Sequence, residues 1–367
     1  MNVMKGRTLL LILLLARLSA LSQDARFPDI SKFHKPPDNP VLSADSSFTF
    51  RDPFSHKEVR WQRADVFNPA AILRAGKVYL LYRAEDNPAA AIGGRTSRIG
   101  LAVSADGIHF HKYPAPVLYP GHDRFARYDH PGGCEDPRVV RSPEGSYVMT
   151  YTAWNDTTAR LSIAISPDLV HWKKQGPAFA NAYKGKFLNL WSKSGSIIAE
   201  LREGVMTARK INGKYWMYWG EQFINLAWST NLRDWYPLLD SHGNLLAIAR
   251  PRAGKFDSEL TECGPPALFT TAGILLMYNG KNAMDGKADP ALPRGTYSTG
   301  EIIFDARDPG KVINRSDTSF LRPSLPHELT GQYKAGTTFA EGLVYFQGKW
   351  FLYYGTADSY VGVTVTP

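Results

Sequence analysis

GKVYLLYRA, at residues 76–84, is the first of five similar phrases along this chain. The others are GSYVMTYTA (145–153), GKYWMYWGE (213–221), AGILLMYNG (272–280) and GKWFLYYGT (348–356). Each has a turn residue, an apolar and aromatic run, and then a Tyr or Trp followed by small or polar residues. Their starts lie 59 to 76 residues apart, and recurrence at a long, roughly constant period is typical of repeat architectures. Five β-units predict closure into a five-bladed β-propeller with one axial pocket.

An apolar segment precedes each phrase, and a third segment follows most of them. The preceding segments are FNPAAIL (67–73), EDPRVV (135–140), EGVMTARK (203–210), CGPPALF (263–269) and EGLVYF (341–346). They are short, rich in β-branched and aromatic residues, and bounded by Gly, Pro, Asp and Asn, as strands joined by hairpins are. About four strands per repeat match one propeller blade. No long amphipathic helix is visible, so the predicted fold class is all-β.

The composition is that of a large packed protein. Of 367 residues, 44% are hydrophobic and 12% aromatic, which supports a sizeable core. The formal charge is +9, but Lys and Arg are scattered without a run of five. We therefore expect a solvated basic surface and no nucleic-acid partner. The repeat predicts one catalytic propeller domain at 61–367, preceded by an arm at 23–60 that closes the ring.

The N-terminus has the pattern of a secretory signal. Lys5 and Arg7 precede LLLILLLARLSALS, residues 9–22, and Gln23 follows. A charged start, an apolar run and small residues before a cut are typical of a signal peptide, here assigned to 1–22. The uninterrupted apolar run is too short for a membrane span. The mature protein is expected to be periplasmic or secreted.

The chain has two cysteines, Cys134 and Cys263. An exported protein could pair them, and the sequence leaves that open. Two thiols are too few to dominate a structural zinc site, and no close His-Cys spacing accompanies them. We expect no metal and no essential cofactor.

Carboxylates stand beside several of the predicted inner strands. Asp136 follows Glu135 at the start of the second repeat, Glu221 ends the third phrase, and Glu262 precedes the fourth. A single carboxylate in such a place more often caps a turn or forms a salt bridge. Several converging on one axis favour a functional site. Paired carboxylates are the groups that glycoside cleavage requires, one as the acid and one to activate water.

Taken together, EDPR after Gly-Gly-Cys, LLYRA followed by SRIGLAVSADGIHF, the GPP segment and YYGTAD resemble glycoside hydrolase family 130. The resemblance extends from about Asn68 to Asp358. It implies a five-bladed propeller that acts on β-mannosides, as an inverting phosphorylase or an inverting hydrolase. It also implies that Asp136 is the general acid. In the phosphorylases this Asp is thought to act through the 3-hydroxyl of the mannose.

The third and fourth repeats depart from the phosphorylase pattern. Phosphorylases typically read K-I-x-G-K-Y-x-M-L-H-R-P in the third blade, where His and Arg help to hold phosphate. This chain has Trp219, Gly220 and then Glu221, and it has Glu262 where phosphorylases carry a small residue. A phosphate dianion needs cationic donors, whereas a water nucleophile needs a base. The pattern resembles the hydrolase branch, whose described members cleave β-1,2-linked mannosides.

The resulting hypothesis is an inverting, exo-acting β-mannosidase that takes manno-oligosaccharides. Asp136 would protonate the leaving oxygen, and Glu221 and Glu262 would position and deprotonate water, with the base left open between them. Arg160 resembles a phosphate-facing Arg of the phosphorylases. For the sugar-binding candidates a structural salt bridge is an equal alternative. These candidates are Asn68, Arg83, Arg98, Arg138, Lys210 and Asp358.

Three alternatives remain open at this point. The first is a β-mannoside phosphorylase that releases mannose 1-phosphate. The second is a non-catalytic sugar-binding propeller. The third is a hydrolase of another five-bladed family acting on arabinose- or fructose-containing glycans, which the Gly-Gly-Cys-Glu-Asp-Pro-Arg context and the YYGTAD ending fit less well. The linkage, the substrate length and the oligomeric state are not determined by the sequence.

Overall fold

Each repeated phrase forms a strand that is paired on both sides, in five successive antiparallel sheets. The computed structural model describes residues 27–91 and 94–367, so the expected signal peptide at 1–22 lies outside the described residues. The phrases fall on β4 (Lys77–Glu85), β8 (Tyr147–Trp154), β14 (Lys214–Trp219), β20 (Gly273–Lys281) and β24 (Lys349–Thr356). These strands are buried over most of their length, which explains their continuous apolar runs.

Each sheet is formed by strands that are close together in the sequence. The first contains β3 (Asp65–Arg74), β4, β5 (Ser97–Ser104) and β6 (His111–Lys112). The second contains β7 (Gly133–Arg141), β8, β9 (Ala159–Ser166) and β10 (Lys173–Pro177). The third contains β11 (Ser196–Arg202), β12 (Val205–Ala208), β13 (Lys210–Ile211), β14, β15 (Ile224–Ser229), β16 (Tyr236–Pro237) and β17 (Ala247–Ala249). The fourth contains β18 (Leu260–Cys263), β19 (Ala267–Thr270), β20, β21 (Tyr297–Phe304) and β22 (Val312–Arg315). The fifth contains β23 (Phe339–Phe346), β24 and β25 (Tyr360–Val365).

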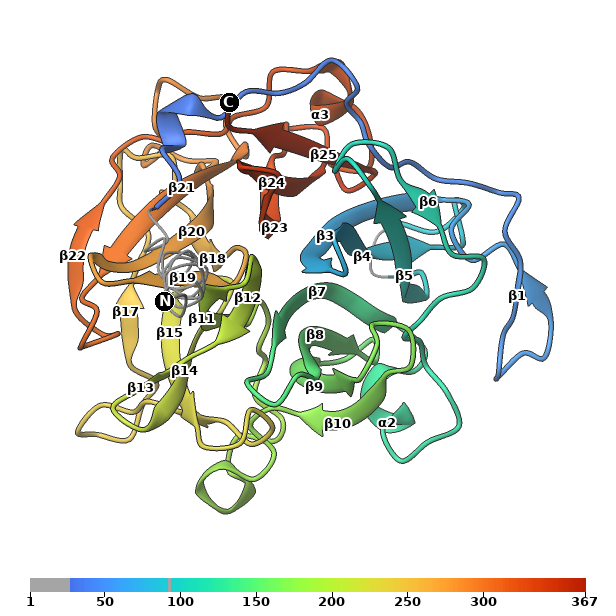
Figure 1. Ribbon diagram of the computed structural model, residues 1–367, viewed down its shortest axis with the longest axis horizontal. Helices are drawn as coiled ribbons and strands as arrows, with labels where there is room; N and C mark the ends of the chain where they lie inside the picture. Colours follow the sequence, from blue (N-terminus) through green and yellow to red (C-terminus); the bar gives the residue numbers. More distant parts are fainter. Residues whose placement is uncertain (1–26, 92–93) are drawn as a thin grey trace, which may run out of the picture.

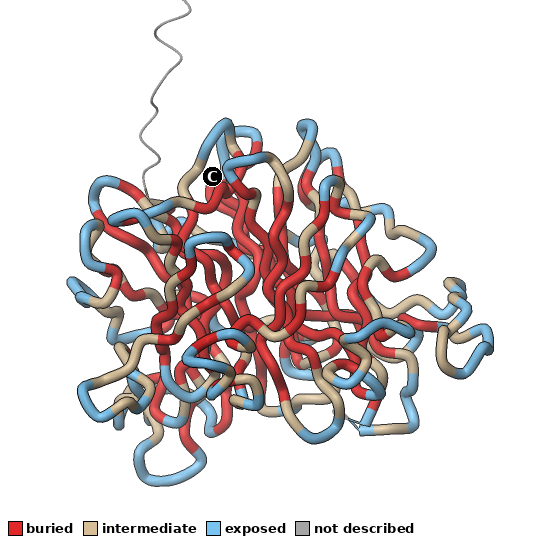
Figure 2. Tube along the Cα trace, turned by 90° about the horizontal axis from the view of Figure 1, so that it is seen from below, coloured by how far each residue is buried: buried red, intermediate tan, exposed pale blue. Residues whose placement is uncertain are grey.

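The sheets follow one another around a common centre in chain order (Figure 1). Short parallel pairings join neighbouring sheets: β5 meets β7 at Ser97 and Gly133, and β11 meets β19 at Ile198 and Ala267. The last sheet packs against the first through β23 and β3. Buried residues run through the interior along the strands, and the exposed ones gather in the loops (Figure 2). The fold is all-β.

The segment before the first sheet lies along the last one. His34 forms a β-bridge with Val365, and Leu42 forms one with Val361, both on β25. A small hairpin of β1 (Phe50–Arg51) and β2 (Glu58–Val59) follows. The only helices among the described residues are single turns: η1 (Ile30–Lys32), α2 (Ala126–Asp129), η2 (Ala182–Gly185) and α3 (Pro326–Leu329). None of them is long and apolar enough to cross a membrane.

The third repeat departs from the predicted strand pattern, and the two cysteines are unpaired. The segment at 203–210 forms β12 and the start of β13. β13 pairs with the first half of β14, and the preceding β11 pairs with its second half. β12 pairs with β11 instead, so the predicted lead-in is divided between two strands. Cys134 and Cys263 are both free and buried. They belong to different core clusters, so the structure contains no disulfide between them.

Candidate active site

Bulges at the inner strands of two sheets turn polar side chains toward one point. The pairing of β3 with β4 shifts register at Asn68, and that of β7 with β8 shifts at Asp136. Both residues have left-handed backbone, with φ of 48°, a conformation that Asn and Asp tolerate better than most residues. Each is followed by a proline. Bulges of this kind re-aim side chains and are common beside active sites.

Asp136 is surrounded by donors and cations. Asn68 Nδ2 donates a hydrogen bond of 2.9 Å to Asp136 Oδ1, and Arg83 Nη1 lies 3.3 Å from the same oxygen. Lys193 Nζ is 3.8 Å from Oδ2. Burial alone would raise the pKa of Asp136, but the nearby positive charges and the Asn68 hydrogen bond outweigh it and hold that pKa at about 2. In the sugar-free site this carboxylate is therefore ionised.

Arg83 holds three carboxylates together. Its Nη2 is 2.7 Å from Glu85 Oε1 and 3.0 Å from Glu135 Oε1, in addition to the contact with Asp136. Its guanidinium lies 4.8 Å from the centre of the Phe67 ring. Burial raises the pKa of Glu135 despite these cations. Every polar edge of Arg83 is thus engaged, and its side chain is only 5% exposed.

The segment Trp191–Ser194 brings contacts to the remaining carboxylates. Trp191 Nε1 donates to Glu221 Oε1, and Ser194 Oγ donates to Glu262 Oε1 at 2.5 Å. Lys193 Nζ lies 3.8–3.9 Å from Glu135, Asp136 and Glu221. Sequence reasoning missed all three residues. The repeat marks only the starts of the inner strands. Residues 191–194 connect two sheets, so they have no periodic signal.

Glu221 and Glu262 differ in their surroundings. The Glu221 side chain is 26% exposed, whereas Glu262 is buried on β18. Burial raises the pKa of Glu262 to about 7, and the charge of Glu221 adds to this while Lys193 opposes it. Glu262 therefore exchanges a proton near neutral pH, as an acid or base catalyst does.

Arg138 does not face the cluster as a sugar ligand would. It is fully buried, and its guanidinium donates to the backbone carbonyls of Asp136 (3.0 Å), Cys263 (2.8 Å) and Gly264 (3.2 Å). Its Nη2 is also 3.0 Å from Glu341, where burial raises the carboxyl pKa well above its usual range. Arg138 therefore joins the strand that carries Asp136 to the strand that carries Glu262.

Two further predicted sugar ligands, Asp358 and Arg98, differ in their position relative to the carboxylates. Asp358, in the turn between β24 and β25, lies near Arg83 and Asp136, and burial raises its pKa to about 6. Arg98 is bound to Asp52 and Asp86, at 2.8 and 2.7 Å, on the side of β5 away from Arg83.

Within the described part of the chain, Lys210 and Arg160 make their contacts outside the carboxylate cluster. Lys210 is exposed on β13, with its ammonium 5.0 Å from the Tyr215 ring centre. Arg160 bonds to Asn189 and to the carbonyl of Thr158, and its guanidinium lies 5.3 Å from the Tyr128 ring centre. The structure does not bring either cation to the carboxylates.

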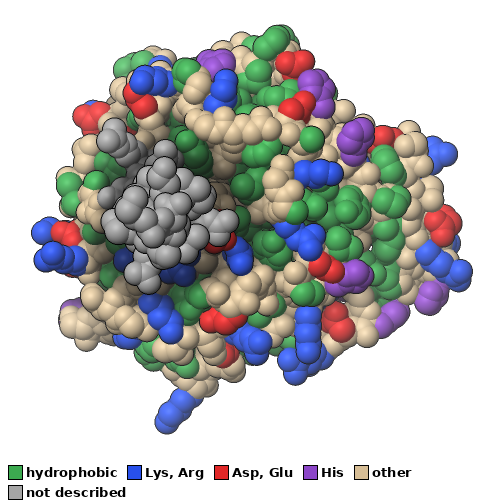
Figure 3. Space-filling view, in the orientation of Figure 1, with side chains coloured by type: hydrophobic (Ala, Val, Ile, Leu, Met, Phe, Trp, Pro, Cys, Tyr) green, Lys and Arg blue, Asp and Glu red, His purple; other side chains and the backbone are tan. Residues whose placement is uncertain are grey.

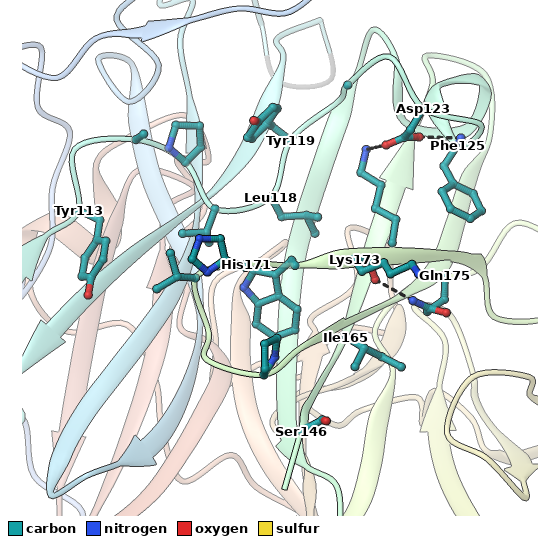
Figure 4. A pocket seen from close by; sticks show the side chains of 18 of the residues that line it. Tyr113, Leu118, Tyr119, Asp123, Phe125, Ser146, Ile165, His171, Lys173 and Gln175 are labelled. Carbon is teal, nitrogen blue, oxygen red and sulfur yellow. Dashed lines mark hydrogen bonds and ion pairs between the residues drawn. The ribbon is translucent and has the colours of Figure 1, made fainter. Parts of the chain in front are cut away.

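A separate hollow of about 1250 Å³ lies on the outer side of the first two sheets (Figure 4). It is lined by the loop after β6 and by β10, and it contains none of the predicted site residues. Lys174 in its wall is already paired with Asp129 and Asp123. On the face seen in Figure 3, positive and negative side chains are interspersed. The carboxylate cluster, and not this hollow, is the candidate active site.

The cluster holds more acids than cations. Glu135, Asp136, Glu221 and Glu262 surround Lys193, with Arg83 at one side. Within 27–91 and 94–367, no group of three His, Cys, Asp or Glu residues is arranged to hold a metal ion. What remains is an arrangement of carboxylates with separated pKa values, which suits proton transfer to and from a neutral substrate.

Comparison with known families places this chain among enzymes that act on β-mannosides. A sequence model of the glycosyl hydrolase 130 family, described as beta-1,4-mannooligosaccharide phosphorylase, matches residues 32–367. A protein named 1,2-beta-oligomannan phosphorylase, from Thermoanaerobacter sp. (strain X514), is 33% identical over 313 residues, which is 84% of this chain and 92% of that protein.

Solved structures share both the fold and much of the sequence. One is described as "The GH130 family of mannoside phosphorylases contains glycoside hydrolases that target beta-1,2 mannosidic linkages in Candida mannan". It is 48% identical with a TM-score of 0.90, and the match covers 94% of this chain and 96% of that one. A glycosyl hydrolase from Bacteroides ovatus is 47% identical with a TM-score of 0.89, over 94% and 96% of the two chains.

Proposed function

The chain belongs to glycoside hydrolase family 130, and we propose that within this family it is an inverting, exo-acting β-mannosidase that hydrolyses β-1,2-linked manno-oligosaccharides. Relatives named in the comparisons include both phosphorylases and glycoside hydrolases. The assignment therefore depends on whether phosphate or water attacks the sugar. The observation that carries the proposal is the pair of carboxylates, Glu221 and Glu262, beside a fully paired lysine.

The charges of the site disfavour phosphate. A phosphate dianion binds where cationic donors are free to receive it. Lys193 is paired with Glu135, Asp136 and Glu221. Arg83 is paired with Glu85 and with the same Glu135 and Asp136, and Arg160 is bonded to Asn189. Bringing a dianion next to Glu221 and Glu262 adds repulsion between like charges. Water carries no charge, and a neighbouring carboxylate can take its proton.

The proposed reaction divides the work between the two sides of the cluster. Asp136 transfers a proton to the leaving oxygen, directly or through a sugar hydroxyl, and Glu221 or Glu262 takes the proton of the attacking water. With Asp136 at a pKa of about 2 and Glu262 at about 7, the reactive form is the minor one in which the shared proton lies on Asp136. Attack by water opposite to the leaving group inverts the anomeric centre.

The architecture that we propose for this enzyme is the five-bladed propeller. It is supported by the five antiparallel sheets arranged in chain order around one centre (Figure 1). The bridges of His34 and Leu42 to β25 support a role of the arm at 23–60 in closing the ring. Residues 1–22 have the pattern of a signal peptide, and on that pattern we propose export to the periplasm or medium.

Product analysis with and without phosphate tests the proposed function. β-1,2-Mannobiose is incubated with the purified protein in phosphate-free buffer and in phosphate buffer. We expect the same rate of mannose release in both, and Asp136→Asn should reduce it at least about a hundredfold. Release of mannose 1-phosphate, with no free mannose when phosphate is omitted, would establish the phosphorylase instead.

A non-catalytic sugar-binding protein is a different class of function, and the same preparation separates it. Calorimetry would then detect manno-oligosaccharide binding while no mannoside is cleaved under either condition. Against this reading stands the pKa of Glu262 at about 7, since a site that only binds neutral sugars has no need for an acid that titrates near neutral pH.

A further inference from the structure

We propose that Trp191 is a sugar-stacking platform for the second mannose unit of the substrate, the unit beyond the one that is cleaved. This inference rests on the proposed function, because it assumes that the carboxylate cluster takes manno-oligosaccharides. It adds a binding subsite and a residue that determines the preference for oligosaccharides over single sugars. Four observations carry it.

The first observation is exposure. Trp191 is 50% exposed, and no other tryptophan in the part of the chain that the structure describes is classed as exposed. A large apolar ring in water is unfavourable by about 25 cal/mol per Å² of apolar surface. The neighbouring residues Phe187 and Leu190 in the same segment pack against the core. The Trp191 ring does not pack against this core, although the adjacent Leu190 does.

The second observation is that the exposed ring is held in place. Trp191 Nε1 donates to Glu221 Oε1. The ring also contacts Trp154 edge-on, with centroids 5.7 Å apart and planes at 69°, an arrangement that aromatic pairs prefer. An ordered ring loses little conformational entropy when a ligand binds to it. Trp191 is thus a fixed surface, unlike a mobile side chain in a loop.

The third observation is position. Trp191 is joined through Glu221 and Lys193 to the cluster around Asp136. Exposure increases along this path, from 6% at the Asp136 side chain to 26% at Glu221 and 50% at Trp191. A sugar held at Asp136 therefore has its continuation toward solvent on the side where Trp191 stands.

The fourth observation is chemical fit. A pyranose ring has an apolar face of C–H groups that can cover an aromatic face and remove it from water. The polar edge of such a sugar would meet Glu221, which accepts the indole N–H, and Lys193 beside it. The ring and the N–H of Trp191 thereby have separate tasks. The ring receives the sugar, and the N–H orients Glu221.

Trp191→Ala and Trp191→Phe separate these two tasks, and both are examined in an Asp136→Asn background that binds substrate without cleaving it. Titration calorimetry with mannose, β-1,2-mannobiose and β-1,2-mannotriose measures the Kd of each protein. We expect Trp191→Ala to weaken the two oligosaccharides about tenfold or more and mannose less than about twofold. Trp191→Phe keeps a ring, so its Kd values should stay within about threefold of the Asp136→Asn parent.

Tyr183→Ala is the matched control. Tyr183 is 43% exposed on η2, which precedes Trp191 in the chain, and its contacts go to Phe187, Tyr236 and Pro237, away from the carboxylates. Tyr183→Ala should leave the Kd of every sugar unchanged. Trp191→Leu serves as a second variant if Trp191→Ala does not fold, and it should lose oligosaccharide affinity in the same way.

The outcomes distinguish this inference from the proposed function. If Trp191→Ala or Trp191→Leu binds the oligosaccharides as tightly as the Asp136→Asn parent does, the proposed role of Trp191 is wrong. An equal loss in Trp191→Phe and Trp191→Ala would also overturn it, because the N–H alone would then be responsible. If the parent binds none of the three sugars, and the wild type cleaves none, the proposed function itself fails.

Discussion

At the scale of single residues, the proposed reaction depends on one proton that is distributed between two carboxyl groups. The cations around Asp136 hold its pKa at about 2, and burial raises the pKa of Glu262 to about 7. Glu262 was found from the sequence because it stands directly before the apolar lead-in of the fourth repeat. Lys193, which balances the cluster, was not found, because a lone lysine in a connecting segment is ordinarily a solvated surface residue.

The pH dependence of kcat/KM tests this sharing. Between the two pKa values the pair carries one proton, so the reactive fraction is constant; above pH 7 the proton leaves, and kcat/KM should fall about tenfold per pH unit. In Glu262→Gln only Asp136 titrates, and the decline should extend without a break from about pH 5 to about pH 9. Glu301→Gln, on β21 outside the cluster, should keep the wild-type profile. If a break near pH 7 persists in Glu262→Gln, a group other than Glu262 is responsible for it.

At the scale of strands, bulges and close approaches set the geometry. Asn68 can reach Asp136 only because Gly355 on the neighbouring strand has no side chain: a Cβ there would lie 2.0 Å from Asn68 Oδ1. The Asn-Pro and Asp-Pro pairs at 68–69 and 136–137 lie within the predicted strands at 67–73 and 135–140. The left-handed backbone at both residues was not predicted, because a residue before proline ordinarily adopts an extended conformation.

Gly355→Ala should therefore disturb the site as well as the fold. Overpacking by one methyl group typically costs about 1–3 kcal/mol, so the Tm should fall by several degrees, and kcat should fall as Asn68 is pushed from Asp136. Gly286→Ala, with no atom within 4 Å of the new Cβ, is the control and should change neither quantity. Thermal unfolding and mannobiose kinetics measure both effects, and an unchanged kcat in a folded Gly355→Ala protein would contradict the proposed role of Asn68.

Arg138 joins two strands that each carry a candidate catalytic group. Lysine at this position keeps the charge beside Glu341 but cannot serve the three carbonyls that Arg138 now satisfies. We expect Arg138→Lys to lower the free energy of unfolding by about 2–4 kcal/mol and to reduce kcat more than KM. Arg141→Lys, at the end of the same strand, is the control. Denaturant unfolding measures the change in stability, and mannobiose kinetics measure kcat and KM. A rise in KM with unchanged kcat and unchanged stability would instead favour direct sugar binding by Arg138.

At the scale of the whole molecule, the sequence predicted the all-β fold, because each repeat contains the same buried strand. It predicted the third repeat less well. There β13 and the preceding β11 both pair with β14, while β12, in the middle of the expected lead-in, pairs with β11. The predicted sugar ligands differ in the direction in which they face: Asn68, Arg83 and Asp358 lie with the carboxylates, whereas Arg98 and Lys210 face elsewhere. Spacing along a strand gives the face of a residue only when its register is known, and the bulges shift that register.

The central claim is that water, and not phosphate, attacks the sugar, and proton NMR of the first product tests it most directly. β-1,2-Mannobiose is cleaved in phosphate buffer, and the anomeric signals are followed from the first minutes. The account predicts free α-mannose as the first product, before it equilibrates to the β anomer. α-Mannose 1-phosphate as the first product would contradict the account.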